Sequence, residues 1–123
     1  MSAELDPLYA APLAEFVAVR KGLAAAAKAA GDRASATAIA QRARPTPSAW
    51  AANQLWRQAR PLWDRLVDAT RAVGRGDLAA VGEQRATLAA LRARAIELAQ
   101  AAAQPASEAM LAKLDTNLRA LAA

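Results

Sequence analysis

The sequence predicts an all-α protein, a bundle of five or six helices that ends in a long antiparallel helical hairpin. Three observations predict this class. Alanine, the residue with the highest helix propensity, supplies 39 of the 123 residues. Apolar residues recur at spacings of three and four along most of the chain, which is the period of an amphipathic helix. Proline and glycine gather between those segments, where they mark helix starts and stops.

The first third of the chain predicts an irregular arm followed by two helices. The arm covers residues 1–11, and the first helix begins near Pro12, because proline suits the first helical position. This helix ends at Gly31, whose tolerance of positive φ suits a helix C-terminus. Asp32 caps a second helix that runs to about Arg44, since a residue before proline avoids helical geometry.

The central segment predicts one helix or two. Thr46-Pro47 opens a helix, and Pro61 either kinks that helix or restarts it, which is why the count is five or six. The turn Gly74-Arg75-Gly76 ends this segment. No linker rich in glycine or serine divides the chain, so residues 1–123 are predicted to form a single domain.

The last two helices are predicted to pair as the hairpin. Asp77 caps the longest helix, residues 78 to about 103, and Ser107 with Glu108 opens the final one. Leucines on the facing sides form a seam, which internal packing explains most simply and which could also serve as a dimer interface or receive a partner helix. The leucines of this seam are Leu88, Leu91, Leu98, Leu111, Leu114 and Leu118.

The residue types exclude several kinds of chemistry. The chain has no cysteine and no histidine, which removes disulfides, the usual transition-metal sites and triads built on imidazole or thiol. Asp64 and Asp68 are spaced i, i+4 and could bind a divalent cation or act as acid and base, but ion pairing with neighbouring arginines is the more common role. We therefore predict a protein that is not an enzyme and that has no metal or cofactor.

A membrane location is not expected. No stretch approaches the roughly 20 apolar residues that span a bilayer. The N-terminal residues Met1 to Asp6 lack the basic start and hydrophobic run of a secretory signal. We expect a cytoplasmic protein without a membrane partner.

Positive charge is concentrated in the central third of the sequence. The net charge of the chain is +5, and between residues 31 and 75 eight basic residues face three acidic ones, so this segment carries the whole excess. Such a segment favours a polyanionic partner, DNA or RNA. Arginine outnumbers lysine 13 to 3 in an alanine-rich chain, which a genome of high GC content also produces without selection for nucleic acid.

The third predicted helix carries the strongest candidate site. Trp50, Asn53 and Arg57 fall at i, i+3 and i+7, so one face presents an aromatic plane, an amide and a guanidinium, the groups that stack on bases, read base edges and hold phosphates. The predicted contacts to nucleic acid, of low sequence specificity, are Arg42, Arg44, Trp50, Asn53, Arg57 and Arg60. In the alternative interpretation, Trp50, Trp56 and Trp63 form the core and the arginines are solvated.

Several of these residues also carry a resemblance. The residues Leu8-Tyr9, Pro12-Leu13, Phe16, Arg20 and Gly31-Asp32, and the run from Arg44-Pro45-Thr46 to Trp50, Asn53 and Leu55, form a pattern over roughly the first 55 residues. This pattern resembles an uncharacterised alanine- and arginine-rich family of helical proteins from actinobacteria and proteobacteria. The resemblance implies no catalytic residue. Together these observations predict a non-catalytic binding module, associated with nucleic acid through its basic centre; the alternative is a protein-interaction, scaffolding or dimerisation module that uses the C-terminal hairpin.

Overall fold

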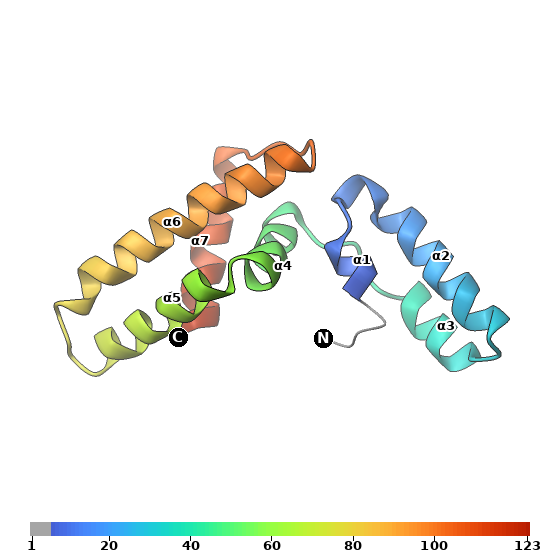
Figure 1. Ribbon diagram of the computed structural model, residues 1–123, viewed down its shortest axis with the longest axis horizontal. Coiled ribbons are helices and arrows are strands. Elements are labelled where there is room, and N and C mark those ends of the chain that lie inside the picture. Colours follow the sequence, from blue (N-terminus) through green and yellow to red (C-terminus); the bar gives the residue numbers. More distant parts are fainter. Residues whose placement is uncertain (1–5) are drawn as a thin grey trace. The chain divides into compact units, whose positions relative to one another are not determined.

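The computed structural model describes residues 6–123, and within that range every regular element is a helix (Figure 1). This confirms the predicted all-α class. The chain divides into two compact units, one that ends at Thr46 and one that runs from Pro47 to Ala123. The first five residues of the predicted arm lie outside the described residues.

Three α-helices and one short 3-10 helix make up the first unit: α1 (Asp6–Ala10), η2 (Leu13–Glu15), α2 (Phe16–Ala29) and α3 (Arg33–Ala40). The prediction of an irregular arm is wrong for the part that forms α1. The expected stop after α2 is confirmed, because Gly31 has a φ of +84°. Asp32 caps α3 as predicted, but α3 ends at Ala40 and not near Arg44.

Two arginines explain why the chain after α3 is not helical. Arg20 Nη1 donates a hydrogen bond of 2.7 Å to the carbonyl oxygen of Arg42, and Arg44 Nε donates one of 3.3 Å to that of Leu13. Hydrogen bonds between residues far apart in the sequence therefore hold this segment against α2 and η2. Helix propensity is a property of single residues, so it does not predict such contacts, and tertiary contacts of this kind can override it.

The core of the first unit forms around the start of α2. Leu8, Leu13 and Phe16 are buried, and the ring of Tyr9 lies 6.1 Å from that of Phe16. The guanidinium of Arg20 lies 5.7 Å from the centre of the Phe16 ring, within the range of a cation–π contact. The residues that carry the family resemblance in this unit are thus mostly residues that build its fold.

Four helices make up the second unit: α4 (Pro47–Gln58), α5 (Arg60–Gly74), α6 (Ala80–Ala101) and α7 (Glu108–Ala122). Pro47 begins α4, as predicted. Pro61 restarts the chain as a separate helix, because a proline ring clashes with the carbonyl four residues earlier and cannot donate to it. The break falls at Ala59, whose φ of −129° and ψ of 39° lie outside the helical region.

The antiparallel hairpin in this unit is formed by α5 and α6, which lie side by side in Figure 1. Two contacts between side chains join them. Arg65 Nη2 lies 2.7 Å from Glu83 Oε1, and Gln84 Nε2 donates a hydrogen bond of 3.2 Å to Thr70 Oγ1. α7 packs mainly against α4 and also contacts α5 and α6. The hairpin predicted for the last two helices is therefore not confirmed.

Leucines from all four helices form the core of the second unit. The most deeply buried are Leu55, Leu66, Leu91, Leu114 and Leu118. α7 begins with the predicted cap, since Ser107 Oγ accepts a hydrogen bond of 3.1 Å from the backbone N–H of Met110. The carboxylate of Asp77, the predicted cap of α6, accepts a hydrogen bond of 3.1 Å from the backbone N–H of Ala79, one residue before α6 begins.

Candidate nucleic-acid interface

Trp50, the indole predicted to stack on a base, lies in the core. Its exposed fraction is 4 %. On the same face of α4, Asn53 and Arg57 are half-buried. The spacing of these three residues was predicted correctly, but the face they share is turned toward the protein and not toward a ligand. The prediction that Trp50 stacks on a base is therefore wrong, and the alternative prediction, that Trp50 belongs to the core, is confirmed.

Arg42 and Arg44 belong to the first unit, whereas the other four predicted contacts belong to the second. Arg44 is held by its hydrogen bond to the Leu13 carbonyl. Arg42 takes part in the same arrangement through its own carbonyl oxygen, which accepts from Arg20, while its side chain is exposed. Both residues therefore have a structural part in the first unit.

The exposed aromatic group of the second unit is Trp56, which the sequence had placed in the core. Its exposed fraction is 38 %. The guanidinium of Arg60 lies 4.4 Å from the centre of its ring, a close cation–π contact. α4 ends and α5 begins between these two residues, so the break at Ala59 carries Arg60 over the indole. The sequence contains a signal for this difference. Trp56 follows Trp50 by six residues, which places the two indoles on different faces of α4, so both could not be buried on one face.

Arg60 is also paired with Asp64, one of the two carboxylates that were candidates for catalysis. Arg60 Nε lies 3.2 Å from Asp64 Oδ1, and both side chains are more than half exposed. An exposed pair of this kind contributes little to stability and can exchange partners. Asp68 is exposed on the same helix. Within residues 6–123, no group of three or more acidic side chains lies close enough to hold a metal ion.

The leucine seam does not offer a surface to a partner. Each of its six leucines is buried within the chain: Leu88, Leu91, Leu98, Leu111, Leu114 and Leu118. The proposed interface is therefore wrong, and internal packing accounts for the seam. The large apolar side chains that the described chain exposes most, Leu78 and Leu121, lie outside it.

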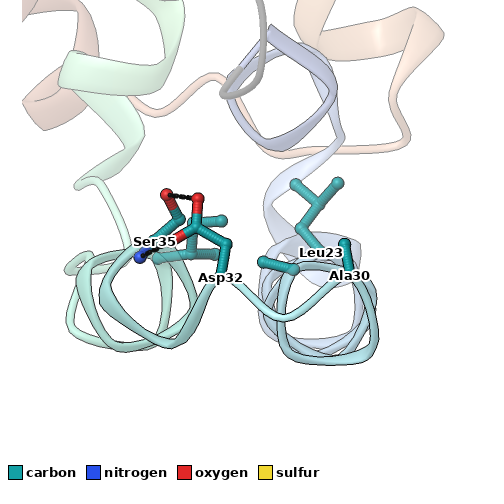
Figure 2. A pocket seen from close by; sticks show the side chains of 6 residues that line it. Leu23, Ala30, Asp32 and Ser35 are labelled. Atoms are coloured by element: carbon teal, nitrogen blue, oxygen red, sulfur yellow. Dashed lines mark hydrogen bonds between the residues drawn. The ribbon is translucent and has the colours of Figure 1, made fainter.

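The first unit carries a hollow of about 250 Å³ between α2 and α3 (Figure 2). Leu23, Ala27, Ala30 and Ile39 supply its apolar lining. Asp32 and Ser35 form its polar edge: the Asp32 carboxylate accepts from the Ser35 backbone N–H at 3.0 Å and from the Ser35 hydroxyl at 2.7 Å. These two hydrogen bonds, the backbone one first, lower the pKa of Asp32 below its ordinary value.

The fold and the surface define an all-helical protein whose exposed Trp56–Arg60 pair is the strongest candidate contact. None of the helices in the described part of the chain combines the length and the apolar character that a membrane crossing requires. Comparison of the chain with protein-family models, with curated proteins and with solved structures found no match. The family resemblance therefore stays a prediction.

Proposed function

We propose that this protein is a non-catalytic, cytoplasmic binding module that associates with single-stranded nucleic acid through Trp56 and Arg60. The observation that carries the proposal is the exposed indole with a guanidinium 4.4 Å from its ring centre. An aromatic plane stacks on any base, and an adjacent cation neutralises phosphate, so the pair supplies both contacts that binding without sequence preference uses. In a duplex the bases already stack on one another, which is why we favour a single strand.

The positive charge of the second unit supports this proposal. The second unit has exposed arginines with no acidic partner among the described residues, including Arg71 on α5, Arg75 directly after α5 and Arg85 on α6. Phosphate groups can compete with Asp64 for Arg60, because the ion pair is exposed and therefore weak. On binding a nucleic-acid strand, the protein would lose the contact between Arg60 and Asp64 and gain several contacts between its arginines and the phosphates.

The test is fluorescence anisotropy of labelled single-stranded DNA and RNA, with a duplex of the same sequence, at low and at physiological salt. We expect Trp56→Ala to weaken binding of the single strand by about 5-fold to 160-fold, the range that loss of one stacked base gives. Arg60→Gln should weaken binding and reduce the slope of log affinity against log salt by about one unit.

Arg119→Gln is the matched control. Arg119 pairs with Asp115 at i, i+4 over 2.9 Å, and its side chain is 51 % exposed, the same fraction as that of Arg60. The two substitutions therefore remove the same charge from similar ion pairs, but Arg119 has no described contact with an aromatic ring. Unchanged affinity in Trp56→Ala, or equal losses in the two arginine variants, would contradict the proposal.

Protein interaction is the second candidate function, and one observation favours it. The hollow between α2 and α3 has an apolar lining that the leucine seam cannot offer, because the seam is buried. If the full chain binds none of the nucleic acids at low salt, this hollow becomes the surface to examine, with Leu23→Glu as the variant that should abolish binding of a partner or of a second copy.

A further inference from the structure

The two helices of the first unit carry a second hollow, of about 330 Å³, that differs in chemistry from the apolar one. It is lined by Lys28 from α2 and by Arg33, Ala36 and Thr37 from α3. Residues of an α-helix are 100° apart, so Lys28 points away from the line of Leu23, Ala27 and Ala30. One hollow is therefore apolar and the other is cationic.

The cationic hollow has no counterion of its own. The side chains of Lys28 and Arg33 make no ion pair or hydrogen bond with other residues of the described range. Lys21 lies two helical turns before Lys28 on the same face of α2 and is equally unpaired. Three positive charges thus repel one another along one surface of a small unit.

The nearest described acidic side chains do not compensate these charges. Asp32 is engaged with Ser35 and lines the apolar hollow. Glu15 precedes Lys28 by 13 residues, which is about 20 Å along the helix axis at about 1.5 Å per residue. Neither carboxylate forms an ion pair with Lys28 or Arg33, so the two cations stay open to an anion.

The remaining groups favour a phosphate among anions. Thr37 adds a hydroxyl donor to the two cations of the lining. Arginine and lysine donate several hydrogen bonds to the oxygens of one phosphate. Lys28, Arg33 and Thr37 are exposed, so the hollow is shallow and suits a small hydrated anion better than a large apolar ligand.

We infer that the hollow formed by Lys28, Arg33 and Thr37 is a binding site for a phosphate group, carried by a small phosphate compound or by a nucleic-acid backbone. The site lies in the other unit from the Trp56–Arg60 pair and goes beyond the proposed function. Its lining contains no aromatic residue, so it recognises the phosphate and not a base.

The experiment is NMR titration of the full ¹⁵N-labelled chain with pyrophosphate, and separately with a short single-stranded DNA. We expect saturable shifts of the amide signals of residues 28–37 with at least one of the two probes. Shifts with pyrophosphate identify a site for small phosphate compounds, and shifts with DNA alone identify a backbone contact. Absence of saturable shifts at these residues with both probes would overturn the inference.

The double variant Lys28→Gln/Arg33→Gln should lower the affinity of the shifting probe at least 10-fold. Its fold should be unaffected, since Arg33 starts a helix, where a positive charge is unfavourable. Lys113→Gln/Arg119→Gln removes the same charge from exposed residues of the second unit and should leave the shifts unchanged. Equal losses in both double variants would show a general charge effect and refute the site. Trp56→Ala separates the two proposals, because it should leave the pyrophosphate titration unchanged.

Discussion

The burial of Trp50 and the exposure of Trp56 can be tested through stability. Their exposed fractions, 4 % and 38 %, differ by about a third of a side chain that buries up to about 250 Å². At about 25 cal/mol per Å², this difference is worth about 2 kcal/mol. Trp56→Ala also loses the cation–π contact with Arg60, about 0.5–1 kcal/mol at an exposed site, which reduces the gap.

Trp50→Ala further leaves a cavity, and truncation of a core tryptophan costs about 3–5 kcal/mol in total. We therefore expect Trp50→Ala to lower the free energy of unfolding by at least about 1 kcal/mol more than Trp56→Ala. For a unit of this size each 1 kcal/mol shifts the melting temperature by roughly 4–8 °C. Urea denaturation followed by far-UV circular dichroism measures the difference, because this signal does not depend on the tryptophans themselves.

Two outcomes would refute the reasoning: equal losses for the two variants, or a larger loss for Trp56→Ala. Should Trp50→Ala fail to fold, Trp50→Phe and Trp56→Phe provide the same comparison with smaller changes in volume. Trp50→Phe should then destabilise the protein and Trp56→Phe should change its stability little.

Three further predictions concern local contacts. Ser107→Ala should destabilise the protein by about 1 kcal/mol in chemical denaturation and Ser107→Gly by only a few tenths, because glycine tolerates the cap position; a larger loss for glycine would contradict a cap at α7. The pKa of Asp32 is lowered in the folded state, so Asp32 stabilises the fold above its ordinary pKa of about 3.9, and this contribution is lost as the pH falls through the folded pKa. Asp32→Asn should therefore reduce the fall in melting temperature on acidification. An unchanged pH profile would count against the cap. Arg20→Ala should cost about 1–2 kcal/mol and accelerate amide hydrogen exchange in residues 41–46, whereas Lys21→Ala should do neither.

The sequence by itself determined the helical class and most of the helix boundaries. Gly31 ends α2, Pro47 begins α4, Pro61 separates α5 from α4, and Ser107 caps α7, as the local chemistry of these residues predicts. Such signals are readable because each acts within one turn of its own position, through a fixed φ, a missing N–H or a side chain that bonds the nearest backbone.

The tertiary structure alone decided which faces are buried and which helices pair. The alanines of α6 lie on several sides of the helix, so its sequence does not single out one partner, and α5 packs along it where α7 was expected. Periodicity placed Trp50, Asn53 and Arg57 on one face of α4 but did not say that this face is turned inward, with Trp56 left outside. The reason is physical: spacing along a helix fixes the angles between side chains, whereas the direction of the whole helix depends on contacts with residues far away in the sequence.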